Sequence, residues 1–188
     1  MKTLALITAS LVFLPLLGSA QAPVGPGSIK LDKIAPEVVK TPEFNLSSGP
    51  TKRTPGRPGQ WLEIEVAYET KAEEIDELTF KFTALVEKQL LTGEVSYVNI
   101  QKGKDHFAVV YISPKGLEKL LGGHPLTATA IENVWVEVNQ QGKVLDKTSY
   151  KPGAIPNAAQ KPGFLLNKNQ TPFAPLFYDR YEEIKPTR

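Results

Sequence analysis

The stretch that decides the fold class is Gln60-Trp61-Leu62-Glu63-Ile64-Glu65-Val66-Ala67-Tyr68-Glu69. Its large apolar side chains alternate with glutamate and alanine, so an extended chain would be apolar on one side and polar on the other. This period of two predicts a β-strand that has one face in a core and the other in water. Residues 78–86 repeat the alternation, which places a second strand shortly after the first.

Further strands are predicted toward the carboxyl end. Residues 95–101 and 106–112 are expected to pair as a hairpin through a glycine-containing turn at 102–105. A second hairpin is expected from residues 127–139 and 143–150. The predicted inward-facing side chains are Leu62, Ile64, Val66, Phe80, Phe82, Val109, Val134, Val136 and Val138.

Only residues 114–121 predict a helix. Ser113 can cap its first turn, Pro114 suits the first helical position, and Gly122 can end it. Because strands recur with almost no helix between them, we expect hairpin or arch connections rather than βαβ crossovers. The expected fold is therefore all-β, an antiparallel β-sandwich with one short helix.

The first twenty residues read as a secretory signal peptide. Lys2, the apolar run at 4–17 and the small residues at 18–20 match its three parts, so the mature chain would begin at Gln21. An uncleaved anchor is the alternative, but a membrane-spanning helix needs about 20 apolar residues and this run is shorter. We expect an exported protein with no integral span after cleavage, located in the periplasm, in the outer envelope or at the cell surface.

Composition divides the remaining chain into three parts. Residues 21–40 are a Pro/Gly-rich N-terminal segment, residues 41–150 are the predicted sandwich, and residues 151–188 are a linker followed by an aromatic segment. Proline disfavours helix, so the N-terminal part is expected to be extended or irregular, with an edge strand at 44–46. The basic stretch 51–59 predicts an exposed loop.

Charge and composition exclude several classes of function. The chain has 22 basic and 20 acidic residues, and removal of the signal with Lys2 leaves a net charge of +1 (21 minus 20). Binding of nucleic acid or anionic lipid needs a dominant basic surface, which this balance does not supply. The absence of cysteine excludes disulfides, thiol catalysis, thiolate metal sites and a lipoprotein tether.

Groups suited to catalysis are few. Only His106 and His124 could act as acid–base groups near neutral pH, and Asp105 would point to the opposite face of a strand from His106. No nucleophile elbow, phosphate loop, zinc helix or calcium loop is present. The sequence therefore predicts no enzyme, no cofactor and no metal site. The carboxylates that share one strand face, and that we expect to lie in water, are Glu63, Glu65 and Glu69.

Aromatic residues are the candidates for contact with other proteins. Trp135 alternates with the inward-facing valines of its strand, so it lies on the outer face. The C-terminal aromatic rings are expected to be buried, because each removes about 150–250 Å² of surface from water when it packs. They are expected to pack beside Trp135 on the sandwich, with insertion into a partner as the alternative. The candidate partner-contact residues are Trp135, Phe164, Phe173, Phe177, Tyr178 and Tyr181.

Three stretches carry a resemblance to a known family: residues 58–69, residues 78–82 (Leu-Thr-Phe-Lys-Phe) and residues 132–138 (Glu-Asn-Val-Trp-Val-Glu-Val). In their order and in their residues, these stretches resemble the pilus-like protein family of Akkermansia and other Verrucomicrobia, which is associated with type IV pilus-type gene clusters. The resemblance spans residues 41–150 and implies an immunoglobulin-like fold. A polymerising pilin continues as a long apolar helix after its cleavage site, unlike the sequence after Gly18 here. The resemblance therefore implies an accessory or surface component, and it transfers no functional residue.

The leading hypothesis is an exported, non-enzymatic protein that makes protein–protein contacts in a type IV pilus-like or cell-envelope assembly. Immunoglobulin-like sandwiches carry many unrelated functions, so the fold alone does not decide between hypotheses. The alternative is a secreted carbohydrate-binding or glycoside-active module that uses Trp61, Trp135 and the carboxylates of residues 63–69. A cleft that joins an exposed tryptophan to two carboxylates would favour this alternative.

Overall fold

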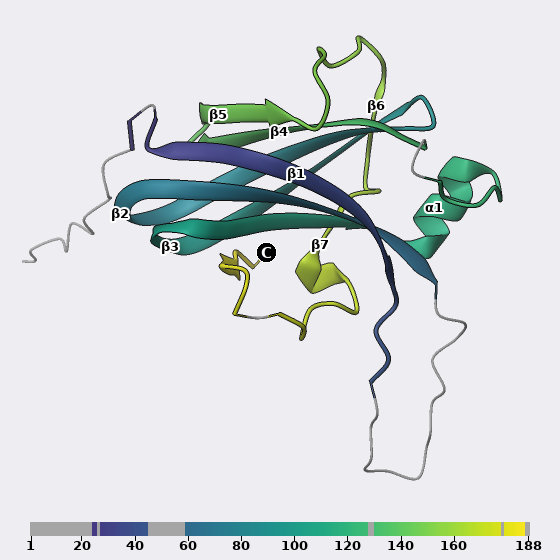
Figure 1. Cartoon of the computed structure of the whole chain (residues 1–188), viewed down its shortest axis with the longest axis horizontal. Helices are drawn as coiled ribbons and strands as arrows, with labels where there is room; N and C mark the ends of the chain where they lie inside the picture. The colour runs from purple at the N-terminus through teal and green to yellow at the C-terminus, as the bar shows by residue number, and fades with distance from the viewer. Residues whose placement is uncertain (1–23, 26, 45–58, 128–129, 178, 187–188) are drawn as a thin grey trace, which may run out of the picture.

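The structure, a computed structural model, describes residues 24–25, 27–44, 59–127, 130–177 and 179–186. Within these ranges the elements are β1 (Ile29–Lys40), β2 (Gln60–Val86), β3 (Gln89–Ile112), α1 (Pro114–Leu121), β4 (Ile131–Gln140), β5 (Lys143–Ser149), β6 (Gln160–Pro162), β7 (Leu166–Asn167), η2 (Lys168–Gln170) and β8 (Glu183–Ile184). The strands form one sheet of order β5-β4-β2-β3-β6, in which β1 pairs with β2, and β7 and β8 pair with β3. This sheet folds over on itself (Figure 1). The predicted all-β sandwich with one short helix is confirmed.

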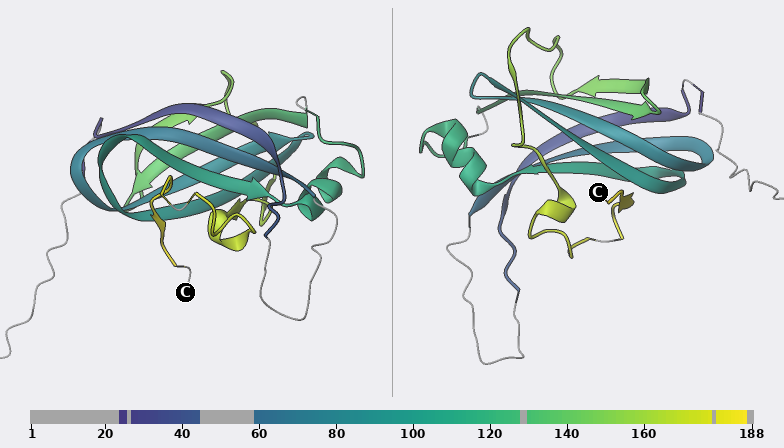
Figure 2. Two further views of the ribbon diagram at one scale, coloured as in Figure 1. Left: turned by 60° about the horizontal axis from the view of Figure 1, so that its bottom comes forward. Right: turned by 180° about the vertical axis from the view of Figure 1, so that it is seen from behind.

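One long hairpin, β2 with β3, contributes to both layers of the sandwich. Its strands pair antiparallel along nearly their whole length, and Glu87 and Lys88 form the turn with φ angles of 46° and 59°. Register shifts on either side of Thr70 bend the hairpin. Layer one therefore contains β1, residues 60–70 of β2 and residues 103–112 of β3. Layer two contains β4, β5 and the rest of the hairpin, as the two views of Figure 2 show.

The space between the layers holds the main core. Tyr68 of layer one contacts Phe80 of layer two, with ring centroids 4.8 Å apart. The backbone N–H of Val109 donates to the hydroxyl of Tyr97 at 3.0 Å and joins the two halves of β3. All nine residues predicted to face inward are buried. The side chain of Val109, however, does not face the space between the layers as predicted. It belongs to a second apolar cluster on the outer face of layer one.

The predicted helix is confirmed with its caps. The Ser113 hydroxyl accepts from the Gly116 N–H at 3.1 Å, and Pro114 occupies the first turn. Gly122 ends the helix in the left-handed conformation, at φ 59°. Within the parts of the chain that are described, no helix is long and apolar enough to span a membrane.

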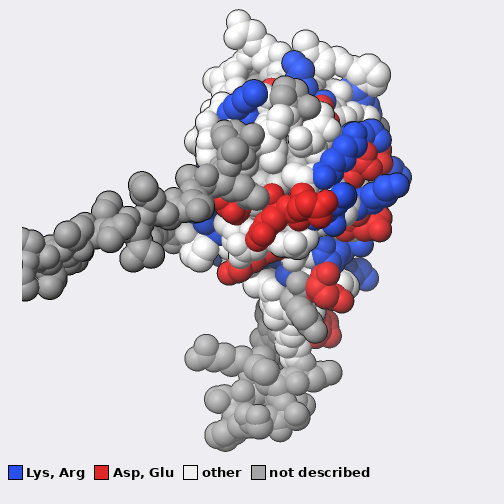
Figure 3. Space-filling view, turned by 90° about the vertical axis from the view of Figure 1, so that its left-hand side faces the viewer, with Lys and Arg blue, Asp and Glu red and all other residues white. Residues whose placement is uncertain are grey.

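The predicted turn at 102–105 is wrong. These residues stay inside β3, and residues 101–106 pair with residues 68–74 of β2. Glycine and charged residues are typical of a turn, which is why one was predicted. In the structure Gly103 instead leaves room for the His106 ring, because a Cβ there would lie 2.6 Å from its Nε2. The charged side chains instead cover the bent end of the sheet. There acidic and basic groups gather together (Figure 3).

Residues 21–40 contain a strand that the proline-rich composition concealed. β1 pairs antiparallel with β2 and buries Ile29, Leu31 and Ile34. Because β1 lies outside β2 in layer one, it tolerates Pro36, which lacks a ladder donor. The edge strand expected at 44–46 is not seen at Phe44, which is irregular and exposed. The rest of that stretch lies outside the described residues.

Two further segments follow β5. Residues 151–159, here called the arch, are exposed and project beyond layer two (Figure 1). Residues 164–186, here called the strap, run along the outer side of β3 and contribute β7 and β8. The sheet thus extends beyond residues 41–150 at both ends, through β1 before them and β6, β7 and β8 after them.

Replacement of Phe82 by alanine should lower the free energy of unfolding by about 3–5 kcal/mol, because Phe82 is fully buried between the layers. The matched control is its neighbour Lys81, which lies on the outer face of layer two, and Lys81→Ala should change stability by less than about 0.5 kcal/mol. Urea titrations of both variants measure the difference. Equal losses would contradict the assignment of the two faces.

Candidate protein-contact surface

The strap covers the outer face of layer one. Phe173 stacks on Tyr111 with centroids 4.7 Å apart and planes at 7°, and it meets Trp61 edge-on at 5.5 Å. Phe173 is only 5% exposed. It is therefore a packing residue of this chain rather than an exposed contact.

Glu65 is held by two residues of the strap. The Arg180 guanidinium donates to both carboxylate oxygens at 3.0 and 2.7 Å, and the Tyr181 hydroxyl donates at 2.7 Å. These hydrogen bonds raise the pKa of Arg180, which also lies 3.6 Å above the Phe107 ring. The expectation that Glu65 would lie free in water is wrong, because residues 115 and 116 positions later cover it.

A small acidic pocket lies beside the hydrogen bonds between Glu65 and the strap. Glu63 is directly opposite Glu37 in the ladder between β1 and β2, and the pocket, of about 310 Å³, also includes Phe177. The pKa of Glu63 is raised, mainly because the carboxylate is buried and also because Glu65 and Glu37 are negatively charged. A hydrogen bond from Tyr111 lowers this pKa but does not cancel the rise. Phe177 is 61% exposed at the rim. Its neighbour, the candidate Tyr178, lies outside the described residues.

The other strap aromatics also lie against this chain. Phe164 is half-buried beside Gly116 of α1, with the Lys119 ammonium 5.6 Å from its ring centre. Tyr181 is half-buried and has the ammonium of Lys168 5.5 Å from its ring. Of the described strap candidates, only Phe177 presents most of its ring to solvent.

Trp135 does not meet the strap, contrary to the expectation. Its indole N–H donates to the Gly153 carbonyl at 2.7 Å, so the beginning of the arch covers it and leaves 8% exposed. Asn133 anchors the same segment by exchanging two hydrogen bonds with the Lys151 backbone, at 2.9 and 2.8 Å. The strap instead follows β3, on the other side of the β2 strand from Trp135.

A groove opens between the arch and layer two. It measures about 440 Å³, and its lining joins Trp135 and Glu137 of β4, Lys147 and Ser149 of β5, and Ile155 of the arch. Ile155 is 39% exposed, and Tyr150, next to the arch, is 43% exposed. We call this the arch groove. It combines exposed apolar groups with a tryptophan, the composition of the core of many protein interfaces.

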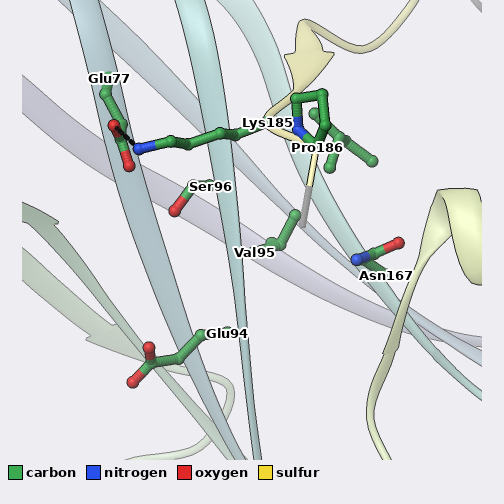
Figure 4. A pocket seen from close by; sticks show the side chains of 8 residues that line it. Glu77, Glu94, Val95, Ser96, Asn167, Lys185 and Pro186 are labelled. Atoms are coloured by element: carbon green, nitrogen blue, oxygen red, sulfur yellow. Dashed lines mark hydrogen bonds and ion pairs between the residues drawn. The ribbon is translucent and has the colours of Figure 1, made fainter. Parts of the chain in front are cut away.

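A larger cleft, of about 690 Å³, lies at the outer edge of β3 (Figure 4). Glu77 and Lys185 form an ion pair across it, and Glu94 lies well apart from that pair. Its side chains therefore do not converge on one point as they would around a reacting group.

The two histidines lie in different settings. Nδ1 of His106 is 2.9 Å from a carboxylate oxygen of Glu182 in the strap, and its ring stacks on Tyr68. His124 is exposed in the loop after α1. No group of three or more histidine or acidic residues placed to hold a metal occurs in the described ranges.

The geometry does not assemble the carbohydrate site that the sequence allowed. Trp61 and Trp135 are each 8% exposed, and the pocket at Glu63 and Glu65 has no tryptophan in its lining. The Glu65 carboxylate is paired with the Arg180 guanidinium. A tryptophan face joined to two free carboxylates is therefore not found in the part of the chain that is described.

One protein-family model matches residues 20–188. The chain belongs to this family. The family description names no activity, substrate or partner. A crystal structure from Akkermansia muciniphila is 28% identical to the chain, with a TM-score of 0.72 over 85% of this chain and 94% of the other. No curated protein matches.

Family membership thus extends past the stretches that carried the resemblance, and it includes both the arch and the strap. Sequence reasoning singled out Trp135 but missed the residues that surround it in the arch groove. Their signal was weak: Ile155 stands alone in a Pro/Gly-rich linker, and Lys147 looks like any exposed strand residue. Their places around one groove depend on how the chain turns after β5.

Replacement of Phe173 by alanine should lower the free energy of unfolding by about 3–5 kcal/mol, because it opens the cluster between Trp61 and Tyr111. Phe177→Ala, the matched control, removes an exposed ring and should cost less than about 0.5 kcal/mol. Thermal and urea unfolding measure both. If the two variants lost equal stability, the strap would not pack as described.

Glu63→Gln should raise the melting temperature at pH 7. The pKa of Glu63 is raised on folding, so the folded state binds its proton more tightly, and ionisation above the usual glutamate range near 4.5 disfavours folding. The gain should be present at neutral pH and disappear as the pH falls below that range. Glu118→Gln, at an exposed helical position, is the control. A gain that is the same at pH 3 and pH 7 would contradict this cause.

Proposed function

We propose that this protein is exported, is not an enzyme, and makes protein–protein contacts in a type IV pilus-like or cell-envelope assembly. The arch groove is the observation that carries the proposal. Ile155 is exposed in its lining, which also includes Trp135, and Tyr150, next to the arch, is exposed as well. Protein interfaces bury exposed apolar and aromatic side chains of the kind that Ile155 and Tyr150 present.

Export is supported by the sequence pattern of residues 1–20, which lie outside the described structure. The family match begins at residue 20, next to the expected cleavage site before Gln21. The assembly part of the proposal rests on the resemblance to pilus-like proteins, together with the similarity to the Akkermansia structure. The periplasm, the outer envelope and the cell surface all agree with it.

The absence of enzymatic activity is part of the proposal. The groups that could do chemistry are engaged in holding the strap: Glu65 by Arg180, and His106 by Glu182. Glu63 lies near them but faces other carboxylates rather than a nucleophile. We expect no hydrolysis of peptide, ester or glycoside substrates by the purified protein.

Site-specific photo-crosslinking in the source cells tests the function. A benzoylphenylalanine that replaces Ile155 should form discrete adducts with another protein of the cell envelope. The same photoreactive residue at Lys104, exposed at the bent end of the sheet, is the control and should form none. Adducts of equal yield at both positions, or no protein adduct at Ile155, would contradict a contact function for this surface.

A further inference from the structure

The partner chemistry can be read from the strand next to the arch groove; this inference rests on the proposed function. β5 is the last strand of the sheet order, so one of its sides faces no further strand. The start of β1 approaches it at Asp146, whose Oδ2 accepts from the Leu31 N–H at 2.7 Å. From there β1 and β5 diverge (Figures 1 and 2). The far end of β5 is therefore an open edge.

The backbone groups at this open edge can be assigned from the ladder. The Tyr150 N–H donates to the Val134 carbonyl at 2.8 Å, toward β4. Since successive residues of a strand alternate in direction, Ser149 and Lys147 aim their backbone groups away from β4. The Lys147 N–H is taken by Asp146 Oδ1 at 2.8 Å. Ser149 thus offers both its N–H and its carbonyl, and Lys147 offers its carbonyl.

The arch groove lies beside this edge. Lys147 and Ser149 line it on the β5 side, and Trp135 and Ile155 line it on the others. A strand added to β5 would project alternate side chains onto the outer face of layer two. One of these would meet the apolar part of the groove. The edge and the groove are therefore suited to the same extended segment.

The exposed charges in and next to β5 are mostly basic and favour an acidic segment, with Glu137 of β4, opposite Lys147, as the one carboxylate among the described residues that line the groove. Lys143, Lys147 and Lys151 are exposed in or next to β5, and none of them forms an ion pair with any described residue. Asp146, the acidic residue within β5, already uses both carboxylate oxygens for backbone N–H groups. A second copy of β5 would instead bring lysines against lysines, a recognised protection of edges against self-pairing.

We propose that the edge of β5 at residues 147–149 binds an extended, acidic segment of a partner protein by strand addition, with one apolar side chain of that segment in the arch groove. Main-chain hydrogen bonds to Ser149 and Lys147 provide the attachment, and the groove and Lys147 select the sequence. The start of the arch, hydrogen-bonded to Trp135 and Asn133, keeps the groove formed before the partner arrives.

The test uses the full chain and a fluorescein-labelled synthetic peptide that alternates glutamate and threonine around one central leucine. A matched peptide carries lysine in place of each glutamate. Fluorescence anisotropy should show the acidic peptide binding at least about tenfold more tightly. Methylation of the leucine backbone nitrogen, which removes one ladder donor without changing the protein, should weaken binding by about tenfold.

Protein variants locate the site. Lys147→Glu and Ile155→Ser should each weaken binding of the acidic peptide by about tenfold. Lys104→Glu makes the same charge change at the bent end of the sheet and should leave binding within about twofold. Equal binding of the two peptides, equal effects of Lys147→Glu and Lys104→Glu, or full binding of the methylated peptide would each overturn strand addition at β5.

The two proposals fail separately. Envelope-protein adducts at Ile155 without binding of the acidic peptide would reject strand addition but leave the contact function standing. Binding of the peptide that follows the expected variants, without any protein adduct at Ile155 in cells, would support the site and reject the proposed function.

Discussion

The pairing of β2 with β3 is the constraint on which the rest of the structure depends. These strands stay hydrogen-bonded from one layer to the other, so the layers are two halves of one ladder rather than separate sheets. The bend at Thr70 decides which residues face one another across the core, and Tyr68 meets Phe80 as a result. Gly103 leaves room for the His106 ring at the bend, because a Cβ there would lie 2.6 Å from its Nε2.

The bend also creates an outer face on layer one that a two-layer core alone would leave exposed. Val109 and Tyr111 point to that side, and the strap buries them with Phe173. Apolar packing and the Glu65–Arg180 pair act together: the pair lies beside the cluster, and hydrogen bonds to a partly covered carboxylate are stronger than those between exposed groups. Layer one is therefore occupied by the protein's own chain.

The outer face of layer two is covered less by the protein's own chain. Among the described residues, the start of the arch lies against this face at one end, where Asn133 and Trp135 bind its backbone. These bonds satisfy two buried polar side chains and hold an otherwise exposed segment against the sheet. The same arrangement leaves Ile155 and Tyr150 in solvent next to an edge strand. The two outer faces of the sandwich thus differ in how far they are covered, because the strap packs along one and the arch only borders the other.

The sequence by itself determined the features that depend on near neighbours along the chain. Alternation identified the buried side of residues 62–66 and 134–138, and Ser113, Pro114 and Gly122 bounded the helix. Only the tertiary structure decided that residues 102–105 continue a strand, that Pro36 lies in one, and that Glu65 meets Arg180 115 positions away. A local pattern records which side of a strand is apolar, whereas the group that covers that side comes from a distant part of the chain. For the same reason, the sequence offered Trp135 as a contact candidate, and the turn of the chain after β5 decided what surrounds it.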